Sequence, residues 1–344
     1  MDISSSTFII LKSNPIHFCP SICTLNIPTV SIVTPSFNQA RFLEQTIRSV
    51  LEQDYPWLEY FVIDGGSTDS SVEIIKKYES KLAGWVSEKD KGQADAINKG
   101  LCQAHGEIVA WLNSDDYYLP GAIQRAVETF RQQPDAGLVY GNVISVDENS
   151  KTFNLQTFKL LNLVDLMSFQ IISQPAVFIR RAVLEQAGPL DPSFHMLLDH
   201  HLWLRMARIA PMVYIPETLA AARYHAKAKN LTNTADFGRE AFRIVDWMES
   251  APEFSSVFRQ NKARILGGAH RLDAFYLLDG RQYGAALSAY GRAFRFNPPV
   301  VLKEWHRVLY AGLALLGLAR LRSIYTRIRS AFHHSKSKIV NPKS

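Results

Sequence analysis

The chain contains 344 residues, of which 47% are hydrophobic and 20% are charged. These values are ordinary for a globular protein of about two domains, and they exclude an intrinsically disordered or collagen-like chain. The net charge is +6, but nine basic residues and one acid lie from residue 303 onward, so the first 302 residues carry −2. A slightly acidic body therefore precedes a basic tail.

The start of the chain and its cysteines indicate the compartment. Cys19, Cys23 and Cys102 are too few for a disulfide framework, which fits a reducing compartment. The first 20 residues have no basic segment ahead of their short apolar patch, so we expect no secretory signal. We therefore predict a cytoplasmic location.

Residues 1–28 are predicted to form an N-terminal extension, after which two sequence patterns alternate. Short apolar runs rich in β-branched residues predict strands at residues 29–34, 59–63 and 107–112. Apolar residues on one helical face predict helices at residues 41–53, 70–78 and 93–104. This alternation favours an α/β fold with a mixed, mostly parallel sheet and flanking helices on both faces.

The pattern becomes helical in the last third of the chain. A strand is predicted at residues 175–180 and a helix at residues 197–210, and no strand pattern follows residue 235. Residues 263–278 and 283–296 predict a helix pair, whose second member resembles a tetratricopeptide helix. Because a single such unit is visible, we expect a helical hairpin packed on the α/β body rather than a repeat array.

The apolar run at residues 308–319 is shorter than the roughly 20 residues that a membrane span needs. It is interpreted either as a buried helix of the C-terminal helical unit or as an interfacial helix whose basic continuation binds anionic lipid headgroups. The second alternative predicts peripheral attachment to the inner face of the cell membrane. The basic residues lie outside the α/β part and lack interleaved aromatic residues, so nucleic-acid binding is not expected.

Polar clusters follow three of the predicted strands, at the carboxyl ends where open α/β sheets bind their ligands. The clusters are Pro35-Ser36-Phe37-Asn38, Asp64-Gly65-Gly66-Ser67 and Asn113-Ser114-Asp115-Asp116. The adjacent acids of the third cluster repel one another unless a cation relieves them, and hard oxygen ligands suit Mg²⁺ or Mn²⁺. The alternative for this cluster is an N-cap for a helix that begins near Pro120.

Three more residues have both a binding interpretation and a structural one. Asp64 can accept a hydrogen bond from a nucleotide base or ribose, or it can belong to a tight turn. Lys91 precedes a helix and can hold a phosphate, although residues 88–95 also fit a solvated loop. Asp199 starts an amphipathic helix and is interpreted as a general base or as an N-cap. The adjacent His200 and His201 point about 100° apart, which disfavours a zinc site.

Together these segments resemble glycosyltransferase family 2 over residues 29–233. Five ordered motifs carry the resemblance: residues 30–38 (VSIVTPSFN), 49–53 (SVLEQ), 62–69 (VIDGGSTD), 90–100 (DKGQADAINKG) and 106–116 (GEIVAWLNSDD). The resemblance implies the GT-A fold, which is the Rossmann-like fold of nucleotide-diphospho-sugar transferases. It also implies a nucleotide-diphosphate sugar as donor, a divalent cation (Mg²⁺ or Mn²⁺) and inversion at the anomeric carbon.

The resemblance assigns roles to individual residues. It implies that the donor is bound by Pro35, Ser36, Asp64, Lys91, Asp95, Ser114 and Asp115. It implies that the metal is bound by Asp115, Asp116 and His225. Asp199 stands where the family keeps its catalytic base, ahead of a Leu-Trp-Leu-Arg helix.

The predicted organisation is an N-terminal extension (1–28), a GT-A domain (29–235), a helical region with the hairpin (236–300), and an amphipathic helix with the basic tail (301–344). The predicted activity is metal-dependent, inverting transfer of a hexosyl group to a carbohydrate or lipid-linked acceptor, in polysaccharide or glycolipid assembly for the cell envelope. Gly65, Asn113 and Leu198 stand where the family often has acids. Asn113 and Leu198 leave a non-catalytic nucleotide-sugar-binding protein as one alternative, and the tetratricopeptide-like hairpin leaves a helical scaffold as another.

Overall fold

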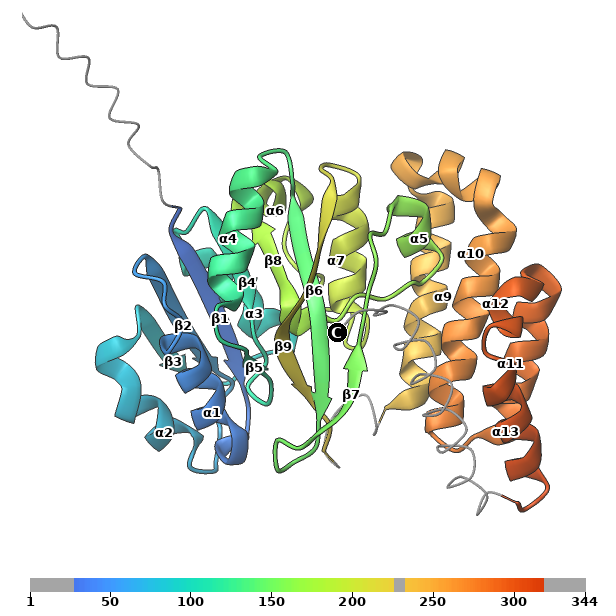
Figure 1. The fold of residues 1–344 in the computed structure, drawn as a ribbon, viewed down its shortest axis with the longest axis horizontal. Helices are drawn as coiled ribbons and strands as arrows, with labels where there is room; N and C mark the ends of the chain where they lie inside the picture. Colours follow the sequence, from blue (N-terminus) through green and yellow to red (C-terminus); the bar gives the residue numbers. More distant parts are fainter. Residues whose placement is uncertain (1–27, 226–232, 319–344) are drawn as a thin grey trace, which may run out of the picture.

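The computed structural model describes residues 28–225 and 233–318. Residues 1–27 of the predicted N-terminal extension, and the basic tail from residue 319 onward, lie outside the described residues. One β-sheet with helices on both faces forms the body of the molecule, and a group of C-terminal helices packs beside it (Figure 1). The predicted α/β fold with a C-terminal helical extension is confirmed.

Nine strands form one sheet among the described residues. They are β1 (Val30–Ser36), β2 (Leu58–Asp64), β3 (Gly84–Ser87), β4 (Ile108–Trp111), β5 (Tyr117–Tyr118), β6 (Leu138–Val146), β7 (Thr152–Gln156), β8 (Val177–Arg180) and β9 (Met212–Arg223). Their order is β3-β2-β1-β4-β8-β6-β9-β5, with β7 paired to β6. The first four run parallel, and two antiparallel steps across β8 return β6 and β9 to the same direction. The carboxyl ends of β1, β2, β4, β6 and β9 therefore share one edge.

Helices cover both faces of this sheet. They are α1 (Ala40–Leu51), α2 (Ser71–Tyr78), α3 (Gln93–Gln103), α4 (Ala122–Gln132), α5 (Leu163–Met167), α6 (Arg181–Ala187) and α7 (Leu198–Ala207). Because successive strand residues point to opposite faces, Ile32 joins the core under α1, α2 and α4, and Val33 joins the core under α3, α6 and α7. The alternation of apolar residues in β1 thus builds two cores with a single strand between them.

The first half of the body follows the sequence pattern closely. Between residues 29 and 112, the three predicted strands and three predicted helices each begin and end within two residues of their predicted bounds. By contrast, β9 lacks a clear strand pattern. The pairing of β6 with β9 shifts register around Asn142, and β9 contains Pro216 and an alanine run at residues 220–222. Interrupted strands of this kind depend on their neighbours, because alanine and proline have low intrinsic strand preference.

Five helices follow the body within residues 233–318. They are α9 (Thr234–Ser250), α10 (Pro252–Asp279), α11 (Tyr283–Phe296), α12 (Pro298–Leu302) and α13 (Trp305–Leu315). Phe237, Ile244 and Met248 of α9 share one hydrophobic core with Leu202 and Trp203 of α7, so this helix is part of the body's packing. The C-terminal half of α10 forms a separate core with α11 and α13.

The apolar run near residue 310 belongs to α13, and its two sides differ. Arg307, Ala311 and Ala314 are buried, whereas Trp305 and Leu309 are each 53% exposed. The helix therefore packs on α11 through one side and presents an apolar side outward. In the part of the chain that the structure describes, no helix is both long enough and apolar enough to cross a membrane.

Candidate active site

The ends of β1 and β2 bring the first two polar clusters together. Ser36 pairs with Asp64 across the parallel strands, and the carbonyl of Ser36 accepts the N–H of Gly65 at 2.8 Å. Asn38, with a left-handed φ of 53°, accepts the N–H of Thr68 on Oδ1 at 2.8 Å. The hydroxyl of Ser36 is buried without a hydrogen-bond partner, at the end of the strand where a ligand is expected.

Asp64 is fully buried and holds the turn that follows β2. Its Oδ2 accepts the N–H of Gly66 at 3.1 Å, the N–H of Ser67 at 2.8 Å and the hydroxyl of Ser87 at 2.7 Å. Gly66 has a φ of 80°, a conformation that favours glycine. The structural interpretation of Asp64 is therefore realised, and its contact with a base or ribose stays a prediction.

The loop before α3 carries the predicted phosphate-binding lysine. Lys91 is exposed, and its N–H donates to Oδ2 of Asp95 at 3.1 Å. Gly92 has a φ of 112°, so the turn between them requires glycine. Asp95 thus closes this loop, and the Lys91 N–H lowers the pKa of its carboxyl. The same loop places Asp90, an acid without a predicted role, against Gly65 just after β2.

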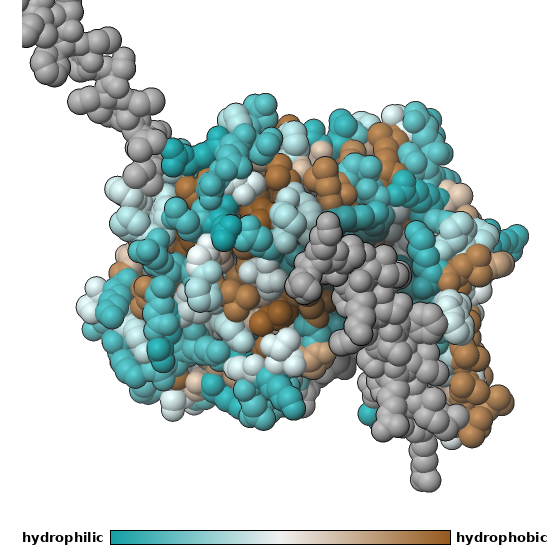
Figure 2. Space-filling model, viewed as in Figure 1, coloured by the Kyte–Doolittle hydropathy of each residue, from teal (hydrophilic) through white to brown (hydrophobic). Residues whose placement is uncertain are grey.

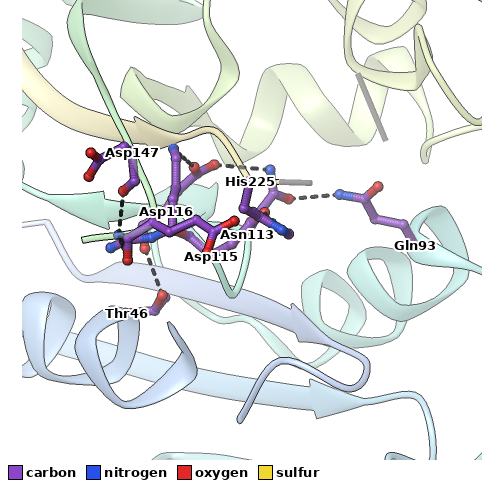
Figure 3. Close-up of polar contacts among 9 residues, drawn as sticks. Thr46, Gln93, Asn113, Asp115, Asp116, Asp147 and His225 are labelled. Carbon is purple, nitrogen blue, oxygen red and sulfur yellow. Dashed lines mark hydrogen bonds and ion pairs between the residues drawn. The ribbon is translucent and has the colours of Figure 1, made fainter. Parts of the chain in front are cut away.

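Asp115 and His225 meet at the centre of the site, although 110 residues separate them in the chain. His225 Nε2 lies 3.0 Å from Asp115 Oδ2, and both come from segments that β5 and β9 bring together by antiparallel pairing (Figure 3). The ring of His225 packs on Phe42 of α1, with centroids 5.0 Å apart. Packing and pairing therefore fix two of the three predicted metal ligands beside each other.

The carboxylate of Asp116 turns away from that pair and into the protein. Its Oδ1 accepts the N–H of Arg223 at 2.9 Å, and its Oδ2 accepts the side-chain amide of Asn113 at 3.3 Å. Burial, and next the negative charge of Asp115, raise the pKa of Asp116 well above its ordinary value. The adjacent acids thus avoid repulsion by facing different surroundings, and the structure does not bring Asp116 to the same point as Asp115 and His225.

The alternative interpretation of this cluster as a helix cap is wrong. Helix α4 begins after Gly121, and no side chain caps it. Ser114 is buried within the loop between β4 and β5. The side chains of residues 113–116 therefore do not cap α4.

Side-chain amides explain why Asn113 can replace the family's usual acid. Its Oδ1 accepts the side-chain amide of Gln93 at 2.7 Å (Figure 3). Its Nδ2 donates to Gln174 Oε1 at 3.2 Å as well as to Asp116. Gln174 in turn donates to the carbonyl of Trp111 at 2.7 Å. An aspartate at this position would have no proton to donate, and it would set a second carboxylate against Asp116. The sequence did not predict that Gln93 and Gln174 contact Asn113.

Arg223 is a further organising residue without a predicted role. It is 4% exposed, and its guanidinium donates to the carbonyls of Asp115 and Asp147, at 2.9 and 3.0 Å, and to Gln45 Oε1 at 2.6 Å. Its guanidinium carbon also lies 4.7 Å from the centroid of the Phe42 ring. In the sequence, the feature that could have indicated Arg223 is its position at the end of the apolar run 219–222, two residues before His225.

Asp199 lies in the first turn of α7, where its Oδ1 accepts the N–H of His200 at 2.7 Å. Leu197 is the N-cap residue, and no side chain of the helix caps it, so the N-cap interpretation of Asp199 is wrong. Burial raises the pKa of Asp199 to about 6, and the nearby Glu240 acts in the same direction. A carboxyl group with such a pKa is suited to accept a proton near neutral pH.

The topology places Asp199 at the same edge of the sheet as the other polar clusters. Helix α7 ends shortly before Met212, which starts β9 at the amino edge, so the helix begins toward the carboxyl edge. Trp203, one turn after Asp199, stacks on Trp111 with centroids 5.2 Å apart. Because Trp111 is the last residue of β4 and Asp115 follows four residues later, α7 packs directly on the strand that leads to Asp115.

The donor set of this site fits a divalent cation that a substrate also ligates. Within residues 28–225 and 233–318, no three His, Cys, Asp or Glu side chains form a metal-binding group. Asp115 and His225 supply one carboxylate oxygen and one imidazole nitrogen. Mg²⁺ and Mn²⁺ sites commonly combine one or two protein ligands with phosphate oxygens and water. The nitrogen ligand favours Mn²⁺ over Mg²⁺, because Mg²⁺ is held almost entirely by oxygen.

Comparison with known proteins identifies the family. Residues 31–188 match the sequence model of glycosyl transferase family 2. A protein of Mycobacterium tuberculosis named as an uncharacterized glycosyltransferase is 31% identical over 196 residues, which cover 55% of this chain and 72% of the relative. The chain belongs to glycosyltransferase family 2. A similarly named protein of Nostoc sp. is 27% identical over 216 residues, covering 59% of this chain and 67% of the relative.

Solved structures of glycosyltransferases share the fold. A fragment of S. aureus TarS in complex with UDP has a TM-score of 0.58 at 18% identity, covering 89% of this chain and 92% of the fragment. The chain spans 49% of the longer TarS structure. Mannosyltransferase PcManGT from Pyrobaculum calidifontis, in complex with GDP-Man and Mn²⁺, has a TM-score of 0.54 at 21% identity, covering 87% of this chain and 83% of that one. The predicted GT-A fold is thereby confirmed.

Proposed function

We propose that this protein transfers a sugar, with inversion at the anomeric carbon, from a nucleotide-diphosphate sugar to an acceptor hydroxyl in the presence of a divalent cation. The observation that carries the proposal is the 3.0 Å approach of Asp115 and His225 at the sheet edge where α7 also places Asp199. UDP-GlcNAc and GDP-Man, bound by TarS and PcManGT, are the donors to test first.

The residues of the site divide the work of this reaction. Asp115 and His225 would hold the cation, which, when bound, would stabilise the negative charge on the departing diphosphate. Lys91, exposed at the start of α3, would contact the same phosphates. Asp199 would take the proton from the acceptor hydroxyl as it attacks, and a positioned base is typically worth about 10²–10⁴ in rate.

The other donor-binding residues shape the edge on which the nucleotide would lie. The unpartnered hydroxyl of Ser36 offers the donor a buried hydrogen bond beside Pro35. Asp64 and Asp95 act on the donor mainly by holding their own turns, since their carboxylates already accept backbone N–H groups. We assign Asp116 the same kind of role, because it orients Asp115 through Arg223.

We further propose that the acceptor is a carbohydrate or lipid-linked glycan at an anionic membrane surface, as in polysaccharide or glycolipid assembly. Helix α13 presents Trp305 and Leu309 outward, and residues 319–344 contain seven basic residues and no acid. An exposed apolar side followed by basic residues favours peripheral binding to an anionic bilayer.

The metal site is tested by calorimetric titration of the protein with UDP and GDP, with and without Mn²⁺. We expect Mn²⁺ to increase the affinity for one of these nucleotides, because its phosphates would complete the coordination that Asp115 and His225 begin. In Asp115→Ala, the gain in nucleotide affinity on adding Mn²⁺ should be at least ten-fold smaller than in the native protein.

Asp135→Ala, which changes an exposed aspartate between α4 and the amino end of β6, at the opposite edge of the sheet from the site, is the matched control. Nucleotide affinity that is unchanged by Mn²⁺ in the native protein, or equal in Asp115→Ala, would contradict the metal role. Release of nucleoside diphosphate from UDP-GlcNAc or GDP-Man separates a transferase from a protein that only binds nucleotide sugars.

A further inference from the structure

A buried carboxylate from the C-terminal helices binds the backbone just ahead of α7, the helix that carries Asp199. Glu240 of α9 is 6% exposed. Its Oε1 accepts the N–H of His195 at 2.7 Å, and its Oε2 accepts the N–H groups of Met196 and Leu197 at 2.9 and 2.8 Å. A buried charge is tolerated only when hydrogen bonds compensate the lost water, and three backbone donors do so here.

These three N–H groups belong to Leu197, which is the N-cap residue of α7, and to the two residues before it. Helices usually begin at a Ser, Thr, Asp or Asn whose side chain caps the first turn, but Leu197 has no polar side chain and no side chain caps α7. The backbone at the start of α7 is held instead through its own N–H groups, by a residue 43 positions after Leu197. The direction of the α7 axis at Asp199 therefore depends on α9.

A second residue of α9 holds the same loop. Arg243, one turn after Glu240, donates to the carbonyl and to the hydroxyl of Ser193, both at 2.9 Å. The loop between α6 and α7 is thus tied to α9 at both residues 193 and 195–197. A shift of Asp199 relative to α9 would therefore break these hydrogen bonds.

We propose that Glu240 is a positioning residue for Asp199, so that the C-terminal helical unit sets the place of the catalytic base. The inference rests on the proposed function, because it takes Asp199 as the base. Glu240 contacts only the backbone ahead of α7 in the contacts described, so it acts through the helix and not on the substrate.

Glu240 also acts on Asp199 through its charge. Its carboxylate raises the pKa of Asp199, in the same direction as the larger effect of burial. The other titratable groups that face Asp199 in the described residues are Tyr276 of α10 and the neighbouring His200. Burial raises the pKa of Tyr276 and lowers the pKa of His200 to about 4, so both are neutral near pH 7. Glu240 is therefore the charged group through which α9 influences the base.

The test uses the full-length protein with Glu240→Gln and Glu240→Asp. Glutamine loses the charge and turns an NH₂ group toward backbone donors, whereas aspartate keeps the charge on a shorter side chain. Glu249→Gln is the matched control, because Glu249 lies on the same helix, is exposed and pairs with Lys262. Hydrogen exchange of the peptide 195–201 reports on the contact without any substrate. We expect exchange at least ten-fold faster in Glu240→Gln and unchanged in Glu249→Gln.

Hydrolysis of UDP-GlcNAc or GDP-Man with Mn²⁺, in which water replaces the acceptor hydroxyl and Asp199 would take its proton, then gives kcat, KM and their pH dependence through the release of nucleoside diphosphate. A displaced base predicts a loss of about 10- to 100-fold in kcat with donor KM within two-fold. In Glu240→Gln the acidic limb of the profile should also move to lower pH, because the charge that raises the pKa of Asp199 is gone. Glu240→Asp should lower kcat while keeping the limb of the native protein.

The outcomes separate this inference from the proposed function. Unchanged exchange at residues 195–201 in Glu240→Gln overturns the positioning role, as does a native kcat with a native pH profile. If instead Glu240→Gln exchanges faster but Asp199→Asn turns over like the native protein, the base assignment fails and the contact stands.

Discussion

Three aspartates of this site, Asp115, Asp116 and Asp199, differ in burial and in hydrogen-bond partners, and these differences suit them to different roles. Asp116 is buried with backbone and amide donors, and burial raises its pKa well above the ordinary value. Asp115 faces His225 and remains partly accessible, which suits a cation and a phosphate. Asp199 has a pKa raised to about 6 by burial at the start of α7, which suits proton transfer. Residue identity alone does not separate these roles, and burial and hydrogen-bond partners do.

At this scale we predict that Asp199→Asn inactivates the enzyme and stabilises its fold. A pKa of about 6 in the folded state lies above the unfolded value of about 3.9, so the folded state binds the proton more tightly. The stability that this carboxyl contributes when protonated is therefore lost as pH rises from about 4 through 6. Asparagine has no charge to bury, so the variant should be more stable above pH 6 by up to about 3 kcal/mol.

Urea unfolding at pH 4 and pH 7, with nucleoside diphosphate release at pH 7, checks this prediction. The stability gain should appear at pH 7 and vanish near pH 4, and turnover should fall about 10²–10⁴-fold. Asp135→Asn should change neither quantity. A variant that is less stable at pH 7, or as active as the native protein, would count against Asp199 as a desolvated base.

At the scale of elements, the C-terminal helices are attached to the body by close backbone contact. Gly268 of α10 approaches the carbonyl oxygen of Ser168, at the end of α5, so closely that an added Cβ would lie 2.0 Å from it. The same helix donates from Arg264 to Asp165 and from Arg271 to the carbonyl of Phe169. These contacts join α10 to a segment of the α/β body, so the unit that carries Glu240 cannot shift independently.

We expect Gly268→Ala to destabilise the protein by about 1–3 kcal/mol, because the methyl group overpacks against main-chain atoms that cannot yield. Gly291→Ala is the matched control, since a Cβ at that helical position of α11 meets nothing within 4 Å. The control should gain about 0.5–1 kcal/mol from the better helix propensity of alanine. Thermal unfolding of both variants measures the difference, and equal or higher stability in Gly268→Ala would refute the tight contact.

At the scale of the whole molecule, charge and apolar surface are unevenly distributed. The first 302 residues carry −2, and the basic residues concentrate beyond them. Hydrophobic side chains gather over α13 at one end of the molecule, where Leu302, Trp305, Leu309 and Leu316 are 53–76% exposed (Figure 2). We call these four residues the α13 face. Its position next to the start of the basic tail suits one side of the protein to an anionic surface.

We predict that Leu309→Glu/Leu316→Glu lowers binding to vesicles of phosphatidylglycerol and phosphatidylcholine by at least ten-fold. Burying one leucine is worth about 1.5–3 kcal/mol, and each glutamate adds a like charge to the anionic surface. Leu160→Glu, at a leucine that is 62% exposed on the body, is the control and should bind as the native protein does. Co-sedimentation at low and high salt measures both effects, and native binding by the double variant would reject docking through the α13 face.

The sequence by itself determined the first half of the body and the places of its polar clusters. Alternating strand and helix patterns located β1, α1, β2, α2, α3 and β4 because each of these segments carries its own periodic apolar signal. The polar clusters at their carboxyl ends followed from the same patterns, and the family resemblance selected Asp115, His225 and Asp199 from among many acids and histidines.

Only the tertiary structure decided which of these residues are in contact and how their side chains are oriented. The pairing of Asp115 with His225 depends on β5 and β9, which lack a strong strand pattern and form through their neighbours. The inward turn of Asp116 depends on an N–H of Arg223, 107 residues away. Glu240 could not be predicted from the sequence, because a carboxylate that binds the backbone ahead of another helix leaves no signal in the sequence of its own helix. Contacts between distant segments are set by packing, which a pattern read along the chain does not contain.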